Sequence, residues 1–185
     1  FQYDSKKSGG VTRSHLRFGD QPIHATYYVE NADFISCSLD EYVFKYDMVS
    51  NLKKGGTFLL NTTFSAEEIE ERLPNSFKKA LAEKEANFYI INATAIASRI
   101  GMGRRTNTIL QSAFFKLANI IPYDQAVEYM KKMAYKSFAK KGDAIVQMNY
   151  NAIDSAAANL IKIDVPASWK DTTEGAPMAS IANDK

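Results

Sequence analysis

The chain has 185 residues, 45% of them hydrophobic and 24% charged, which is typical of one globular domain. A formal net charge of +2 does not favour nucleic acid or an anionic membrane as a partner, and no apolar run reaches the ~20 residues that span a bilayer. The single cysteine, Cys37, excludes an internal disulfide and the thiolate set of an iron–sulfur cluster, so we interpret it as a small buried hydrophobe.

The first part of the chain predicts two half-exposed strands. Apolar and polar side chains alternate over residues 11–18 and again over residues 23–29, with turn-forming residues between them. Strands with one polar face belong at an edge of a sheet or in antiparallel pairs. We therefore expect both segments to be edge or antiparallel additions to the sheet.

Three short runs that are apolar on both faces predict the centre of that sheet. They cover residues 34–37, 57–60 and 88–91, and helical patterns separate them. Runs of this kind are typical of parallel strands covered by helices on both sides. The predicted fold class is therefore α/β, with three layers, a mostly parallel sheet flanked by helices, and a helical C-terminal half.

Two capping-box spacings predict where helices begin after the first two runs. The first is Ser38 with Glu41, and the second is Ser65 with Glu68, after which Pro74 divides the helical stretch into two short helices. We expect the helix after Ser38 to end at a glycine pair. Its apolar residues and that pair are Val43, Tyr46, Val49, Gly55 and Gly56.

The chain from Asn92 onward is predicted to be helical. Residues 92–100 follow the third run directly, and the sequence Gly-Met-Gly at 101–103 ends that helix. Apolar residues recur at helical spacing over residues 106–119, and again in helices that begin at Pro122 and Asp143. The methionines and aromatic residues in these stripes are interpreted as core.

A basic, glycine-containing loop near the start is the first candidate for ligand binding. Glycines let backbone N–H groups approach an anion, and lysines add point charges, so the composition suits phosphate. The alternative is that the lysines are only solvated. The loop consists of Ser5, Lys6, Lys7, Ser8, Gly9 and Gly10.

A second candidate anion site joins two predicted helices at residues 101–108. Backbone N–H groups at the start of the second helix would face an anion, with Arg104 and Arg105 adding positive charge and Asn107 beside them. The competing interpretation, that Thr106 or Asn107 only caps the helix and the arginines face water, is the more favoured of the two on sequence alone.

Catalytic and metal-binding patterns are missing from the sequence. His15 and His24 have no common metal-site spacing, and there is no Ser/His/Asp order, paired-carboxylate pocket or dinucleotide-binding glycine motif. We assign no catalytic residue and no metal ligand. The residues alone therefore lead only to an α/β domain with one or two anion sites.

Four motifs follow one another along the chain. They are Tyr-Asp-Ser-Lys-Lys-Ser-Gly-Gly at 3–10, Leu-Lys-Lys-Gly-Gly-Thr-Phe-Leu-Leu-Asn-Thr at 52–62, Ile-Asn-Ala-Thr at 91–94 and Ile-Gly-Met-Gly-Arg-Arg-Thr-Asn-Thr-Ile at 100–109. In this order they resemble single-chain pyruvate:ferredoxin (flavodoxin) oxidoreductases. The resemblance covers about residues 1–170 and belongs to the gamma-type, or third, domain of that family.

The resemblance implies a role for the chain within a larger enzyme. The whole enzyme decarboxylates pyruvate oxidatively, forms acetyl coenzyme A and passes electrons to ferredoxin or flavodoxin, using thiamine diphosphate, magnesium and iron–sulfur clusters that belong to other domains. For this domain it implies coenzyme A binding, through residues 5–10 above all, and closure over the active site. It also implies a homodimer in the cytoplasm, or in an anaerobic organelle of a eukaryote. Other domains of the same polypeptide would be the partners, and this chain alone would have no activity.

One departure from the family pattern and one alternative remain. The family has a glycine-rich strand, loop and helix ahead of the motif at 3–10, and this chain starts at Phe1. We expect residues 1–170 to form the gamma-type domain without that segment, and residues 171–185 to be a linker or tail. The alternative function is a structural interdomain-packing module with no ligand of its own.

Overall fold

A computed structural model describes residues 16, 22, 23 and 29–173. The predicted loop at 5–10 and nearly all of the two predicted strands at 11–18 and 23–29 lie outside the described residues, as does most of the predicted tail. The strands are β1 (Ala32–Cys37), β2 (Leu52–Asn61), β3 (Asn87–Ile91) and β4 (Ile161–Ile163). The α-helices are α1 (Glu41–Lys45), α2 (Ile69–Arg72), α3 (Asn75–Glu83), α4 (Ala93–Arg99), α5 (Asn107–Ala118), α6 (Tyr123–Phe138) and α7 (Asp143–Ala158), and two 3₁₀ turns are η1 (Ala139–Lys141) and η2 (Ala167–Asp171).

The sheet has the strand order β1-β2-β3-β4. Its first three strands are parallel, and β4 pairs antiparallel with β3. All three runs predicted as buried strands lie in these parallel strands, so that prediction is confirmed. The helices between them are the crossover connections that neighbouring parallel strands require.

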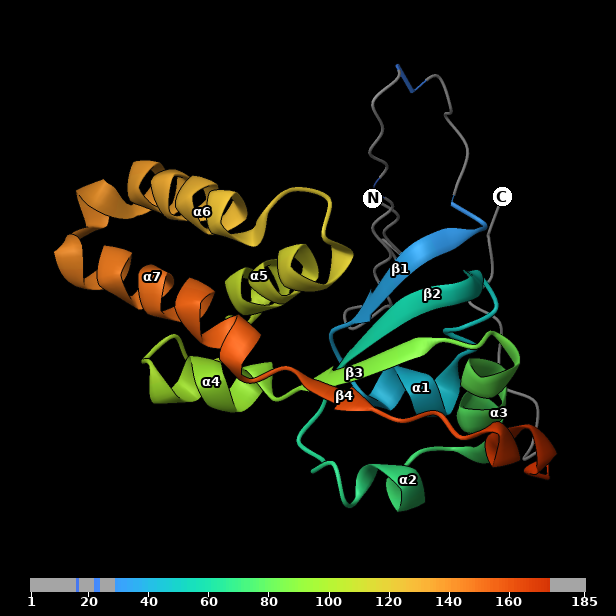
Figure 1. Ribbon diagram of the computed structural model, residues 1–185. Coiled ribbons are helices and arrows are strands. Elements are labelled where there is room, and N and C mark those ends of the chain that lie inside the picture. Colours follow the sequence, from blue (N-terminus) through green and yellow to red (C-terminus); the bar gives the residue numbers. More distant parts are fainter. Residues whose placement is uncertain (1–15, 17–21, 24–28, 174–185) are drawn as a thin grey trace, which may run out of the picture.

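Helices cover both faces of the sheet, as Figure 1 shows. On β2, Phe58 and Leu60 face a core shared with α1, α2, α3 and η2, while Leu59 faces a second core shared with α4, α5 and α7. All three side chains are fully buried. The predicted three-layer α/β architecture is therefore confirmed.

The helix predicted to run from Ser38 to the glycine pair is wrong beyond its first turns. α1 ends at Lys45, because the Asp47 carboxylate accepts the backbone N–H groups of Val49 (3.1 Å) and Ser50 (3.0 Å) and turns the chain. The predicted cap at Ser38 is also wrong, since Asp40 occupies the N-cap position without a side-chain cap.

Gly55 and Gly56 form a bulge within β2 rather than a helix end. The β1–β2 register moves from Ala32 opposite Leu52 to Phe34 opposite Thr57, which places extra residues on β2. Gly55 has a φ of +78°, and a Cβ on Gly56 would lie 2.7 Å from Leu52 Cδ1. Both positions therefore require glycine, for a different reason than the predicted one.

The second predicted capping box is present. The backbone N–H of Ser65 donates to Glu68 Oε2 (3.1 Å), and the backbone N–H of Glu68 donates to Ser65 Oγ (3.3 Å). Helices α2 and α3 follow as two short helices with Pro74 between them, as predicted.

The end of the described chain contains two elements that the sequence did not predict. β4 is a strand of three residues directly after α7, and η2 inserts Trp169 into the core on the α3 face. Trp169 Nε1 donates to Glu70 Oε1 (3.2 Å), and Lys78 Nζ donates to the Glu70 carbonyl (2.8 Å). The prediction that the chain is helical from Asn92 onward is therefore wrong for residues 161–163.

The last two long helices form an antiparallel pair beside the sheet (Figure 1). α6 packs on α7 and α5, and its contact with them is a third, small core. That core consists of Met130, Ala134 and Ile153, with Phe115, Val127, Phe138 and Tyr150 against it. Helix α6 is therefore the outermost layer of the described structure.

Candidate functional site

The polar edge of the sheet lies where the parallel strands end. Asn61, the last residue of β2, is 6% exposed and uses both ends of its amide. Its Oδ1 accepts the backbone N–H of Ala93 (2.9 Å), and its Nδ2 donates to the Ser38 carbonyl (3.0 Å) and to Thr94 Oγ1 (3.4 Å). One side chain thereby joins the segments that follow all three parallel strands.

The next residue along the chain makes a second brace at the same edge. Thr62 is 3% exposed, and its hydroxyl donates to Asp40 Oδ2 (3.0 Å). The same oxygen accepts the backbone N–H of Phe64 (3.2 Å). Thr62 thus ties the loop after β2 to the start of α1.

These contacts show what the edge can do chemically. Ligands of open α/β sheets bind in the crevice outside the carboxyl ends of the strands. The Asn61 amide and the Thr62 hydroxyl are already used in internal hydrogen bonds, so their role is to fix the loops that a ligand would touch. Neither group is a general acid or base at neutral pH.

The Arg104 and Asn107 segment is a tight loop between α4 and α5. Gly101 (φ +85°) and Gly103 (φ +63°) turn the chain in the left-handed region, and a Cβ on Gly101 would lie 3.3 Å from Met148 Cε. Arg104 and Asn107 are both exposed. Thr106, at the N-cap of α5, makes no side-chain cap, so the predicted capping role of Thr106 is wrong.

The two arginines of that loop differ in their contacts. Arg105 Nε donates to the Met102 carbonyl (3.3 Å) within the loop. Within residues 29–173, no hydrogen bond or ion pair is found that joins Arg104 or Asn107 to the Asn61 edge. The structure therefore does not bring these two predicted residues together with the polar edge, and residues 5–10 lie outside the part it describes.

Sequence reasoning missed Asn61 and Thr62 as the residues that organise the edge. The available signal was the abrupt end of an apolar run in Asn-Thr, at the carboxyl end of a predicted parallel strand. The Ile-Asn-Ala-Thr motif gives the same signal one strand further on, where Asn92 caps α4 by accepting the N–H of Ala95 (3.0 Å). Only the sheet order shows that these segments meet.

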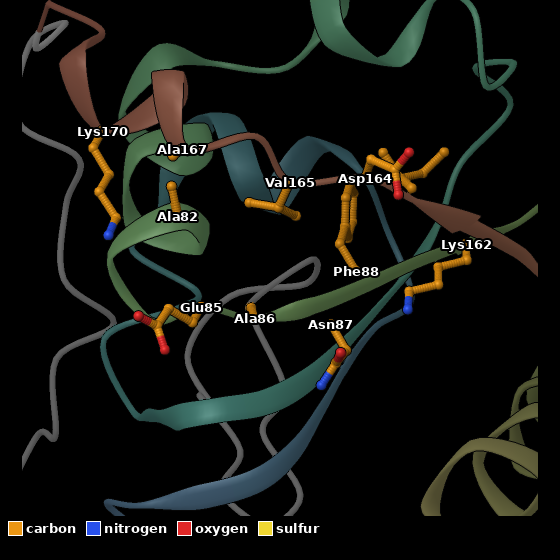
Figure 2. A pocket seen from close by; sticks show the side chains of 11 residues that line it. Ala82, Glu85, Ala86, Asn87, Phe88, Lys162, Asp164, Val165, Ala167 and Lys170 are labelled. Atoms are coloured by element: carbon orange, nitrogen blue, oxygen red, sulfur yellow. The ribbon is translucent and has the colours of Figure 1, made fainter.

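A surface hollow of about 380 Å³ lies at the opposite, amino end of the parallel strands (Figure 2). It lies between the end of α3, β4 and η2, and both signs of charge line it through Glu85, Asp164, Lys162 and Lys170. Because α/β sheets bind ligands at their carboxyl edge, we do not assign the hollow as the functional site.

Titratable and metal-binding groups add little to the site. Burial raises the pKa of the Cys37 thiol to about 12, so the thiol is neutral and a poor nucleophile. Among the described residues, no cluster of His, Cys, Asp and Glu has the arrangement of a metal site. No described helix has the length and apolar character needed to cross a membrane.

Comparison with known proteins gives strong sequence matches. The pyruvate ferredoxin/flavodoxin oxidoreductase family matches residues 1–159. The chain is 51% identical to the pyruvate:ferredoxin oxidoreductase of Moorella thermoacetica over 95% of its own length and 15% of that protein's. It is 52% identical to the pyruvate-flavodoxin oxidoreductase of Enterobacter agglomerans over 92% of its own length and 14% of that protein's.

A solved structure supports the fold. The crystal structure of the PORC subunit of Thermotoga maritima pyruvate oxidoreductase matches with a TM-score of 0.57 and 21% sequence identity, covering 74% of this chain and 67% of that one. The α/β sheet, the collinear motifs and the match over residues 1–159 agree with one another. The chain belongs to the pyruvate ferredoxin/flavodoxin oxidoreductase family.

Proposed function

We propose that the chain is one domain of a longer polypeptide that oxidatively decarboxylates pyruvate and transfers electrons to ferredoxin or flavodoxin. The family match carries the proposal, because it covers most of this chain but only 15% of the Moorella thermoacetica relative. Thiamine diphosphate, magnesium and the iron–sulfur clusters would be bound by other domains, and the whole enzyme would be a cytoplasmic homodimer. The boundaries of the gamma-type domain would be residues 1 and 170.

Within that enzyme, the role we propose for this domain is to bind coenzyme A and close over the active site. Lys6 and Lys7 would contact the phosphates, and the backbone N–H groups of Ser8, Gly9 and Gly10 would approach them closely. The start of α5 would offer a second anion contact, since its N-cap lacks a side-chain partner and Arg104 and Asn107 are exposed beside it.

The test is steady-state kinetics of the full-length enzyme with Lys6 and Lys7 both replaced by alanine. Each lysine–phosphate contact would contribute about 1 kcal/mol and the two together about 2 kcal/mol, so the apparent KM for coenzyme A should rise by about ten- to thirtyfold. The rise should be larger at low ionic strength, because salt screens these contacts. The KM for pyruvate should hardly change.

The chain contains a matched control for this variant. Lys53 and Lys54 also precede a glycine pair, but they are paired with Asp33 (3.0 Å) and Glu85 (3.5 Å). Replacing both with alanine should leave the KM for coenzyme A unchanged. If the Lys6/Lys7 variant also leaves it unchanged at both ionic strengths, the coenzyme A role is wrong and the domain is a structural packing module.

A further inference from the structure

Helix α6 presents an outward face that no other described element covers. Its inward residues Ala126, Met130 and Ala134 are buried against α7 and α5. The opposite side exposes Tyr129 (59%), Met133 (43%) and Tyr135 (55%). Tyrosine and methionine are enriched at the centres of protein–protein interfaces, and an exposed group of them marks an interaction surface.

Two lysines lie among these apolar side chains. Lys132 and Lys136 lie one turn apart between the two tyrosines, and both are exposed. Neither makes an ion pair within residues 29–173. The sequence from Tyr129 to Gly142 contains five lysines, and the nearest acidic residue of α6 is the exposed Glu128, one turn before Lys132, so the net charge of this part of the helix is positive.

A different lysine, Lys131, makes the ion pair that joins α6 to α7. Lys131 faces α7, where its Nζ lies 2.8 Å from Asp154 Oδ2 and 5.6 Å from the centre of the Tyr150 ring. That contact joins the two helices on the inner side. Lys132 and Lys136 therefore remain available for an external partner.

We propose that the α6 outer face, defined as Tyr129, Lys132, Met133, Tyr135 and Lys136, docks an acidic surface of another domain of the same polypeptide. The two tyrosines and Met133 would pack against apolar groups of the partner, and the lysines among them would pair with its carboxylates. The acidic character of the partner follows from charge complementarity. A domain of the same chain is the chosen occupant because the matched segment spans only 15% of the Moorella thermoacetica relative.

This inference rests on the proposal that the chain is part of a longer polypeptide, but not on coenzyme A binding. The mass of the native polypeptide tests that premise first. The coenzyme A kinetics and the docking test can then fail separately, because α6 and residues 5–10 are changed in different variants.

The docking test is hydroxyl-radical footprinting of the native full-length protein, read by mass spectrometry. Met133 is 43% exposed here, so it should be oxidised readily if the α6 outer face is bare. We expect it to be protected several-fold when docked, nearly to the level of the buried Met130. Phe44 on α1, which is 48% exposed, is the reference for an uncovered apolar side chain.

A charge-reversed variant tests the nature of the partner. Lys132→Glu with Lys136→Glu should restore oxidation of Met133 several-fold, because like charges would then face each other. Lys45→Glu on α1, which removes only an exposed pair with Glu41, is the matched control and should change nothing.

Three results would overturn the proposal. Oxidation of Met133 at the rate expected for a bare side chain would show that nothing docks. Protection that survives charge reversal would show that the partner is not acidic. Protection that disappears on dilution would identify a second copy of the protein as the occupant.

Discussion

The sheet and the outer helix α6 differ in how their cores are built. On the α3 face, Phe58, Phe77 and Phe88 pack edge to face or tilted, with ring centres 5.2–6.3 Å apart, within a large continuous core. α6 is held through three buried side chains and their partly buried neighbours. Aromatic pairs add about 0.5–1.5 kcal/mol beyond the area they bury, so stability is concentrated in the sheet.

The comparison predicts that α6 opens at a lower free energy than the sheet. Segments with few buried apolar contacts open locally at lower free energy than the core. α6 meets that description, and its exposed side chains suit a surface completed by a partner. Four measurements test whether the sheet and α6 differ in stability in this way.

Replacing Phe77 with alanine should lower the free energy of unfolding by about 4 kcal/mol. Its ring is 2% exposed and touches Phe58 and Phe88, so the variant leaves a cavity between a helix and two strands. Urea unfolding followed by circular dichroism measures the loss. Tyr129→Ala, on the exposed side of α6, is the control and should change it by less than about 0.5 kcal/mol. Similar losses in the two variants would contradict the comparison.

Replacing Met130 with alanine should have a smaller and local effect. The side chain is 5% exposed, and its loss should weaken α6 packing by about 2 kcal/mol. Hydrogen exchange should accelerate for amides in α6 and η1, while amides in β2 keep their protection. Equal acceleration in β2 would mean that α6 and the sheet unfold as one unit.

The same contrast explains which parts of the fold the sequence could predict. Residues 57–60 and 88–91 are apolar on both faces because helices cover both sides of β2 and β3, so their pattern is visible locally. Residues 34–37 follow the same pattern less strictly, since Ser36 is exposed. β4 has only three residues, and it is a strand only because β3 offers it an edge. Local patterns cannot reveal such a strand.

The errors at Gly55 and at the polar edge have the same origin. A glycine pair after an apolar stripe is a good helix-end signal, but here it serves a bulge whose register depends on β1. Asn61 looked like the end of a strand. Its role depends on Ser38 and Ala93, which are distant in the sequence and meet only once the strands are ordered.

The burial of Cys37 in the sheet also predicts that the free energy of unfolding depends on pH. Because burial raises the pKa of Cys37 from 9.0 to about 12, folding favours the neutral thiol. Its contribution to stability is complete below pH 9 and decreases as the unfolded thiol ionises, by about 1 kcal/mol between pH 9 and pH 10. The measurement is urea unfolding of the wild type and of Cys37→Ala across this range, since the other titrating groups are common to both. A constant difference between the two proteins would mean that Cys37 ionises equally in both states.

The smallest effect is expected at two non-glycine residues whose backbone lies in the left-handed φ region. One of them lies in each part of the molecule. Glu85 (φ 49°) follows α3 in the sheet layer, and Asn119 (φ 50°) follows α5 before α6. Asparagine adopts this conformation at a lower energetic cost than glutamate, so Glu85→Gly should raise the free energy of unfolding by about 0.5 kcal/mol, and Asn119→Gly should change it by less.

The Glu85 variant also loses the exposed pair with Lys54, and Glu85→Ala isolates that loss because it keeps the unfavourable φ. Exposed pairs of this kind contribute about 0.2–1 kcal/mol, so the glycine variant should be more stable than the alanine variant by about 1 kcal/mol. Thermal unfolding of the wild type and all three variants gives the comparison. If Glu85→Gly is no more stable than Glu85→Ala, the backbone at this turn relaxes to accommodate a side chain. The difference in stability between the sheet layer and the outer helices would then not apply to the turns that connect their elements.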